Sequence, residues 1–206
     1  MVEGVLRRLG DAGVTIIEAD VPGLSELIEF ITLPVQVHDV VPSLTTWLQQ
    51  SGANISFDEM LADVSPDVLA VLQDFALPGA PHAISEDAYL AARDIHLPAL
   101  RTLLGDWFAD NRIDAMLLPA TMATAVPIGA DGMVRIGEDE VAFSEAVGRN
   151  IAPGSTAGLP GLVLPAGLAN GLPVAIELDG PAGTDRQLLG IALAIEGMLG
   201  TPKLSQ

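Results

Sequence analysis

Apolar and polar positions in the first part of the chain follow a helical pattern and then a strand pattern. Residues 2–9 place apolar side chains at helical spacing, and Gly10 and Gly13 follow them as typical helix-ending residues. Residues 14–19 are rich in β-branched side chains and lie just before Pro22. We therefore expect a helix followed by a strand.

The next stretch has the pattern of short helices separated by breaks. Residues 24–50 are helical in pattern but contain two prolines, each of which removes a backbone donor, so we expect two or three helical pieces. Ser56 and Glu59 have the spacing of a capping box, and Ser65 before Pro66 combines an N-cap residue with a proline at the first helical position. These signals predict two further short helices.

A longer helix and a buried strand follow. Ser85 caps a helical pattern whose apolar face runs to about Asn111, and Pro98 is expected to kink this helix. Residues 113–118 are apolar except for one aspartate and end at Pro119, which is typical of a strand buried on both faces.

Turn signals divide the following residues. The pair Asp131-Gly132 predicts a small hairpin or loop. Residues 143–149 have a helical pattern, whereas residues 150–158 are rich in small polar side chains and predict an irregular segment.

Two apolar strands are expected to pair with each other. Residues 161–164 and 174–178 are separated by Asn170-Gly171, a pair that favours the positive φ angles of a tight antiparallel turn. The two strands should therefore be neighbours in one sheet.

The C-terminal residues predict a last helix, with Thr184 and Gln187 as a capping box and Gly200 at its end. Together the elements predict an α/β fold, in which a mixed sheet is flanked by helices on both faces. The chain has no internal repeat, linker or composition shift. We therefore expect residues 1–206 to form a single structural body.

Charge and composition exclude several classes of function. With 27 acidic and 9 basic residues the formal net charge is -18, which disfavours nucleic acid as a partner. The chain has no cysteine, which excludes disulfides and Cys-ligated metal sites, and no cofactor is expected. Its apolar runs are too short to span a membrane and its start lacks a secretory pattern, so the expected location is the cytoplasm without a membrane partner.

A long C-terminal stretch resembles the signature of the amidase signature family. The matching pieces, in order, are Gly158-Leu159-Pro160, residues 162–167, residues 171–174, Glu177-Leu178-Asp179-Gly180 and the helix from Asp185. Residues 113–121 and 6–20 are similar to two further segments of the family, so the resemblance covers nearly the whole chain. Arg149-Asn150, Pro153-Gly154 and Leu178-Asp179-Gly180 look most like the branch that includes indoleacetamide and mandelamide hydrolases.

The resemblance implies an α/β/α amidase that hydrolyses a small carboxamide, aryl-bearing if the branch assignment holds, to an acid and ammonia. In the family the nucleophilic serine, a bridging serine on a cis peptide and a lysine base lie in a Gly/Ser-rich N-terminal half, which has no counterpart here. The only lysine, Lys203, lies outside every matched segment. We therefore assign no catalytic residue to this chain. We expect a truncated or split C-terminal half that is inactive alone and has the N-terminal half as its partner, in cis or in trans.

The chain's own contribution is expected at the acyl side of the substrate pocket, because loops at strand ends converge there in open α/β folds. The candidates for the pocket wall are Thr121, Asn150, Ile151, Pro153, Gly154, Ser155 and Thr156. Asn150 or Thr156 could bind substrate or hold the Gly-rich loop, and equally could cap a helix or satisfy loop backbone.

Other chemically suggestive residues have simpler interpretations. Ser155 lies outside a G-x-S-x-G context and has no histidine or lysine nearby in sequence, so it is not taken as a nucleophile. The three histidines lack the spacing of metal ligands, so no metal site is expected. Residues 138–140 are all acidic, and a solvated hairpin tip explains them better than a cation site.

Two other functions remain open at this point. The chain could be a non-catalytic scaffold or partner subunit of a split amidase, or a self-contained α/β binding module. Half of an enzyme should expose apolar area and self-associate, whereas a self-contained module should not.

Overall fold

The computed structural model describes residues 2–130 and 132–200, which fold as two compact units. One unit comprises Met1–Leu24 and Arg101–Gln206, and the other comprises Ser25–Leu100. The expectation that residues 1–206 form a single structural body stays a prediction. Both boundaries fall within or at the start of helices, so neither is accompanied by a change in composition.

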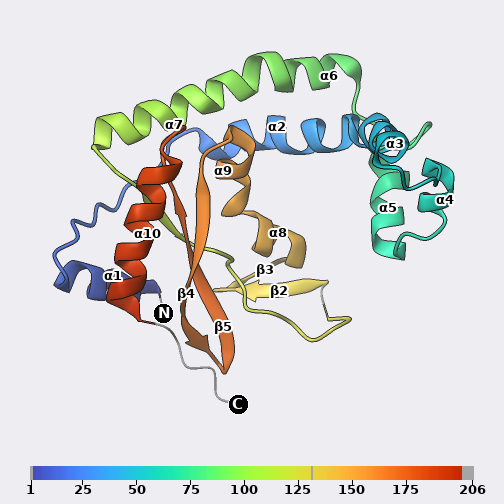
Figure 1. Cartoon of the computed structure of the whole chain (residues 1–206). Helices are drawn as coiled ribbons and strands as arrows, with labels where there is room; N and C mark the ends of the chain where they lie inside the picture. Colours follow the sequence, from blue (N-terminus) through green and yellow to red (C-terminus); the bar gives the residue numbers. More distant parts are fainter. Residues whose placement is uncertain (1, 131, 201–206) are drawn as a thin grey trace. The chain divides into compact units, whose positions relative to one another are not determined.

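The first unit is built on a three-stranded sheet with the order β1-β5-β4 (Figure 1). The strands are β1 (Met116–Pro119), β4 (Gly161–Ala169) and the central β5 (Leu172–Asp179). Both pairings are antiparallel, so the described part of this sheet is antiparallel rather than mixed. The α/β class is confirmed.

The turn between β4 and β5 explains their pairing. Asn170 and Gly171 have φ angles of 52° and 81°, which suit a two-residue hairpin turn. The pairing predicted between these two strands is therefore confirmed, and it extends from Gly161 opposite Asp179 to Ala169 opposite Leu172.

Helices lie on both faces of the sheet. On one face, α1 (Val2–Asp11) and α10 (Asp185–Leu199) enclose the main core. The buried side chains of this core are Val5, Leu9, Ala166, Ile176, Leu178, Leu188, Ala192 and Ile195. The helices α8 (Phe143–Gly148) and α9 (Ile151–Ala157) lie on the other side of β4 and β5 (Figure 1).

Residues 14–19 do not form the predicted strand. They have no regular secondary structure, and the side chains of Ile16 and Ile17 are 42% and 48% exposed. A strand needs a neighbour for its backbone hydrogen bonds, and no described residue pairs with this segment. The prediction was wrong because the pattern reports the local preference and not the presence of a pairing strand.

The predicted hairpin exists but turns at a different place. Strands β2 (Met133–Ile136) and β3 (Asp139–Ala142) pair in a separate two-stranded sheet, with Gly137 and Glu138 in the turn. Asp131 lies outside the described residues, and Gly132 precedes the hairpin. Acidic residues 138–140 are exposed at the tip of the hairpin, as the solvated-tip interpretation predicted.

The capping box predicted for α10 is absent. Thr184 is the N-cap residue, but its hydroxyl donates to the carbonyl of Pro181 at 2.6 Å and makes no cap hydrogen bond. The Gln187 amide donates instead to Asp114 at 3.2 Å. Thr184 thus bonds the preceding turn and Gln187 bonds a residue distant in sequence, in place of the predicted capping box.

The second unit is helical. Its elements are α2 (Leu24–His38), α3 (Val40–Ser51), α4 (Phe57–Leu61), α5 (Pro66–Phe75), α6 (Glu86–Ala91), a π-helical segment at Ala92–His96 and the start of α7 (Leu97–Asn111). The Ser56 and Glu59 capping box is confirmed. The first helical stretch breaks into two pieces, at Asp39 rather than at Pro34.

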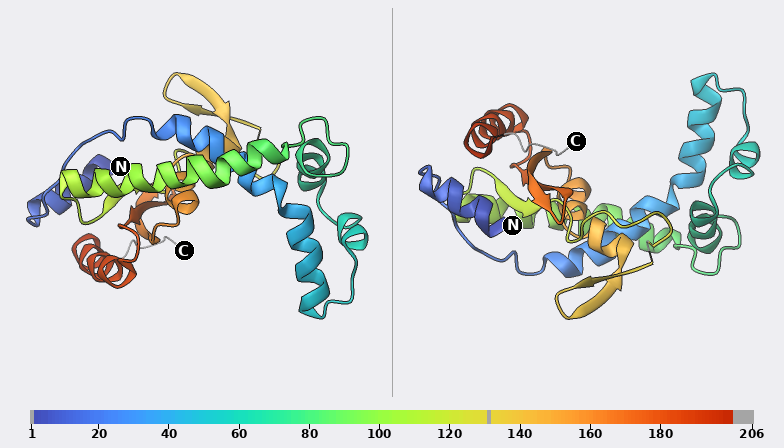
Figure 2. Two further views of the ribbon diagram at one scale, coloured as in Figure 1. Left: turned by 90° about the horizontal axis from the view of Figure 1, so that it is seen from above. Right: turned by 90° about the horizontal axis from the view of Figure 1, so that it is seen from below.

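The long helix predicted from Ser85 is confirmed as three consecutive helical segments, α6, the π-helical segment and α7, which can be followed in Figure 2. The π-helical segment ends at His96, two residues before Pro98. Proline has no N–H to donate to the preceding turn, and a locally wider turn accommodates this loss. Within residues 2–130 and 132–200, no single helix is long and apolar enough to cross a membrane, although the bent pair α2 and α3 together reach that length and composition.

Candidate functional site

The predicted pocket-wall residues lie in two places in the first unit. Thr121 is exposed just beyond β1, and its hydroxyl donates to the carbonyl of Ala123 at 2.7 Å. Asn150 precedes α9, and its side-chain amide donates to the carbonyl of Pro119 at 2.8 Å. Asn150 thus ties the start of α9 to the end of β1, which matches the loop-satisfying alternative.

Residues 151–157 form the helix α9, where the sequence predicted an irregular segment. Pro153 is tolerated because it lies in the first turn, where backbone N–H groups have no partner within the helix. Gly158 ends the helix with a φ angle of 77°, and the N–H of Leu159 donates to the carbonyl of Gly154 at 3.0 Å. The sequence did not predict this short helix, because residues 150–158 are rich in small polar side chains that are typical of loops.

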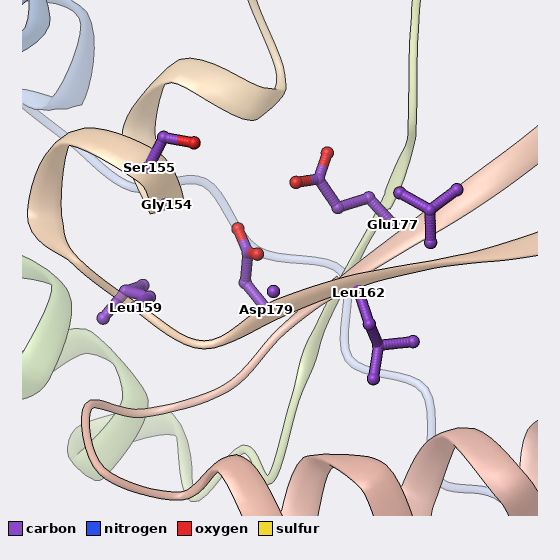
Figure 3. Close-up of a pocket in the computed structure, with 8 residues that line it drawn as sticks. Gly154, Ser155, Leu159, Leu162, Glu177 and Asp179 are labelled. Atoms are coloured by element: carbon purple, nitrogen blue, oxygen red, sulfur yellow. The ribbon is translucent and has the colours of Figure 1, made fainter. Parts of the chain in front are cut away.

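Gly154 and Ser155 line a cavity of about 280 Å³ between α9 and the sheet (Figure 3). Its other lining residues are Leu159, Gly161, Leu162, Val163, Glu177 and Asp179. The remaining predicted wall residues Thr121, Asn150, Ile151, Pro153 and Thr156 are not among those that line it.

Two carboxyl groups dominate the cavity, and sequence analysis did not single them out as site residues. Strand alternation directs Ile176 and Leu178 into the main core and directs Glu177 and Asp179 to the opposite face, toward α9 (Figure 3). Glu177 is 7% exposed and Asp179 is 3% exposed. An acidic residue at alternate positions of an otherwise apolar strand was the available signal.

Burial sets the protonation of both groups. Desolvation, followed by the nearby charge of Asp179, raises the pKa of Glu177 from 4.5 to about 7. Desolvation also raises the pKa of Asp179 from 3.8 to about 6. The Oε2 atom of Glu177 is fully buried and has no hydrogen-bond partner among the residues that the structure describes. The site therefore holds a buried carboxyl oxygen that lacks a donor among the described residues.

Two glycines make room for Asp179. A Cβ atom at Gly161 would lie 2.7 Å from Oδ1 of Asp179, and one at Gly154 would overlap Oδ2. Any larger residue at either position would force the carboxyl group to move. Gly154 and Gly161 thus allow α9 and the start of β4 to lie close to Asp179 of β5.

The cavity has one hydroxyl nucleophile candidate, Ser155, but no base of the kind that activates serine in most hydrolases. The residues that line it include no histidine or lysine. Lys203 lies outside the described residues. The arrangement can bind a donor group and an apolar group, since Leu159, Leu162 and Val163 supply apolar surface beside the carboxyl groups.

A second cavity of about 290 Å³ lies on the other side of the end of α9. Arg101 lines it and donates from Nε to the carbonyl of Ala157 at 2.9 Å, which satisfies one of the last carbonyls of α9. This arginine is therefore used to fix the helix end.

The second unit contains a polar cluster of its own. His38 contacts Asp39 and Glu86, each at 3.1 Å, and its ring stacks on Tyr89 at 4.1 Å. The Tyr89 hydroxyl donates to Asp39 at 2.5 Å, and this hydrogen bond is the main cause of the lowered pKa of Asp39. Within the described ranges no group of three or more His, Cys, Asp or Glu residues could hold a metal ion. The cluster joins the end of α2 to α6.

The sequence of this chain is similar to a protein family and to individual known proteins. The family model described as Amidase matches residues 1–189. An indoleacetamide hydrolase of Agrobacterium vitis is 36% identical over 196 residues, which cover 94% of this chain and 41% of that protein. A mandelamide hydrolase of Pseudomonas putida is 34% identical, with 97% of this chain and 40% of that protein covered.

Solved structures agree on the fold. The crystal structure of an amidase has a TM-score of 0.71 at 24% identity and covers 97% of this chain and 42% of its own. The peptide amidase from Stenotrophomonas maltophilia has a TM-score of 0.70 at 19% identity, with 100% and 40% covered. The chain thus spans about two fifths of the length of the relatives that it matches.

Proposed function

This chain belongs to the amidase family, and we propose that it forms the C-terminal part of an amidase that hydrolyses a small, aryl-bearing carboxamide to the acid and ammonia. The observation that carries this proposal is the match to indoleacetamide and mandelamide hydrolases, which covers nearly all of this chain but about two fifths of each relative. The rest of such an amidase would supply the reacting groups.

The proposed division of labour follows from the chemistry. Amide hydrolysis by serine needs a base to take the hydroxyl proton and donors to stabilise the tetrahedral oxyanion. The family resemblance implies that a serine, a cis-peptide serine and a lysine perform these steps, all outside this chain. After the serine attacks the carbonyl carbon, ammonia leaves, and water then releases the acid from the acyl-enzyme.

This chain would shape the side of the pocket that receives the acyl group. The candidates for this wall are Thr121, Asn150 and the residues of α9 that the sequence predicts. The names of the two relatives, an indoleacetamide and a mandelamide hydrolase, point to aryl amides as the substrate class.

A second candidate is a partner subunit of a two-chain amidase. Exposed apolar residues on α10, Leu189 at 59% and Leu193 at 69%, favour a partner surface over a self-contained binding module. This candidate differs from the first only in whether the catalytic polypeptide is joined to this chain or separate from it.

Ammonia release from indole-3-acetamide and mandelamide tests the proposal. The purified chain is assayed alone and after mixing with the N-terminal polypeptide of the Agrobacterium vitis relative, which comprises the residues that this chain does not match. We expect no turnover by either component alone, because each lacks part of the site, and turnover by the mixture.

The same assay of the variants Ser155→Ala and Glu177→Gln shows whether the reacting groups lie in the cavity of this chain. Turnover by the chain alone that is abolished by either substitution would refute the proposal, because the reacting groups would then lie in this cavity. A mixture made with a polypeptide whose serines are replaced by alanine is the control for contaminating amidase.

A further inference from the structure

Glu177 and Asp179 form an acidic pair that the proposed function does not use. They stand two residues apart on one face of β5, so their Cα atoms are roughly 6–7 Å apart. Both side chains point into the cavity beside α9 (Figure 3). Together they present up to four oxygens to the same enclosed space.

One oxygen of the pair lacks the hydrogen-bond partner that a buried carboxyl group requires. Oε2 of Glu177 is fully shielded and unpartnered, and no ion pair within residues 2–130 and 132–200 involves Glu177 or Asp179. Buried carboxylates are normally paired or supplied with hydrogen-bond donors, because the loss of hydration is otherwise uncompensated. The unpartnered oxygen therefore indicates a donor that this chain does not supply.

The residues around Glu177 and Asp179 restrict the position of Asp179 and leave a cavity beside both carboxyl groups. Gly154 and Gly161 lie so close to Asp179 that neither position has room for a side chain. The cavity of about 280 Å³ remains open beside both carboxyl groups. One side-chain head group fits in such a space together with its hydrogen bonds.

We infer that Glu177 and Asp179 bind a guanidinium group, and that this group belongs to an arginine in the part of the amidase that the present chain does not span. The inference rests on the proposed function for the source of the arginine. The binding chemistry itself rests only on the cavity and its acidic pair.

Guanidinium fits the pair better than an ammonium ion. Its planar fork carries five N–H donors and can bridge two carboxylates, whereas an ammonium is a compact and strongly hydrated charge. A protein side chain is favoured over a free ligand because about three fifths of the length of each relative lies outside the part that this chain matches. The chain's net charge of -18 also favours a basic partner surface.

The first arm of the test uses the chain alone. The side-chain carboxyl carbon of Glu177 is titrated by NMR in guanidinium chloride, methylammonium chloride and sodium chloride at equal ionic strength. Guanidinium should lower the titration midpoint of Glu177 by at least about half a unit relative to sodium, because a bound cation favours the carboxylate. Methylammonium should lower it less. An equal midpoint in all three salts would overturn the inference.

The second arm tests the source of the group in the assembly. The affinity of the chain for the N-terminal polypeptide of the Agrobacterium vitis relative is measured for the wild type, for the double variant Glu177→Gln/Asp179→Asn and for the control Glu138→Gln, which changes an exposed glutamate at the turn between β2 and β3. The double variant should bind at least about tenfold more weakly, and the control should bind like the wild type.

Arginine-to-glutamine substitutions in the N-terminal polypeptide identify the partner. One of them should reproduce the loss and cause no further loss when combined with the double variant. Unchanged affinity of the double variant would refute an arginine at this site. A guanidinium-specific shift without any assembly of the wild-type chain would support the binding site and refute the proposed function instead.

Discussion

Two acidic residues of β5 are buried, and their burial affects the stability of the chain. Glu177 and Asp179 are buried without a cation, and burial raises the pKa of each. A group whose pKa is higher in the folded state than in the unfolded state contributes stability below its unfolded pKa and loses it as the pH rises. These carboxyl groups should therefore weaken the isolated chain near neutral pH.

The free energy of unfolding of the chain should decrease as the pH rises from about 4.5 to about 7, and Glu177→Gln should remove much of this decrease. At pH 8 the variant should be more stable than the wild type by roughly 2–3 kcal/mol, because the amide keeps the shape and lacks the buried charge. Urea unfolding at pH 5 and pH 8 measures both quantities.

Glu196→Gln is the matched control, and it should change the stability by less than about 0.5 kcal/mol at either pH. Asp179 leaves a smaller pH dependence in the Glu177→Gln variant, since its own pKa is raised to about 6. A variant that is less stable than the wild type at pH 8 would show that Glu177 has a partner in the isolated chain.

The position of α9 depends on contacts at both of its ends. The Asn150 side chain bonds the carbonyl of Pro119 before the helix, and Arg101 bonds the carbonyl of Ala157 at its end. Between them, Gly154 allows the helix to approach Asp179. A helix of 7 residues is too short to be stable by itself, so these contacts hold it beside the cavity.

Asn150→Ala should lower the free energy of unfolding by about 1 kcal/mol, because the half-buried carbonyl of Pro119 loses its donor. Asn150→Asp should cost more, since it places an acceptor opposite that carbonyl. Thr121→Ala, which removes a hydrogen bond at an exposed position, is the comparison and should have a smaller effect. Chemical denaturation followed by circular dichroism distinguishes these cases, and equal losses for Asn150→Ala and Thr121→Ala would contradict the structural role of Asn150.

The molecule as a whole presents apolar surface that an isolated globular chain would normally cover. Leu188, Ala192 and Ile195 face the core from α10, while Leu189 and Leu193 form an exposed stripe on the same helix. Residues four apart lie on one side of a helix, so this stripe is continuous. In the proposed amidase the stripe would be covered by the rest of the enzyme.

The isolated chain should therefore self-associate as its concentration increases, and Leu189→Gln/Leu193→Gln should shift it toward the monomer. Light scattering at several concentrations gives the apparent mass. Ile128→Gln, which changes a fully exposed isoleucine in a loop, is the control and should leave association unchanged. A wild-type chain that stays monomeric throughout the concentration series would favour a self-contained binding module.

The sequence by itself determined the elements whose stabilising contacts are local. The Ser56 capping box and the Asn170-Gly171 turn are each formed by neighbours in the chain, so their patterns identified them correctly. The family resemblance was also readable, because its glycines and prolines keep their order and spacing.

Only the tertiary structure decided what depends on distant partners. Residues 14–19 have a strand pattern but no strand beside them, and the Gln187 side chain bonds Asp114 instead of capping its own helix. The sequence shows that Glu177 and Asp179 are two residues apart, but it does not show that both are buried beside α9. Burial and pairing are set by which segments meet in space, and local sequence preferences do not contain that information.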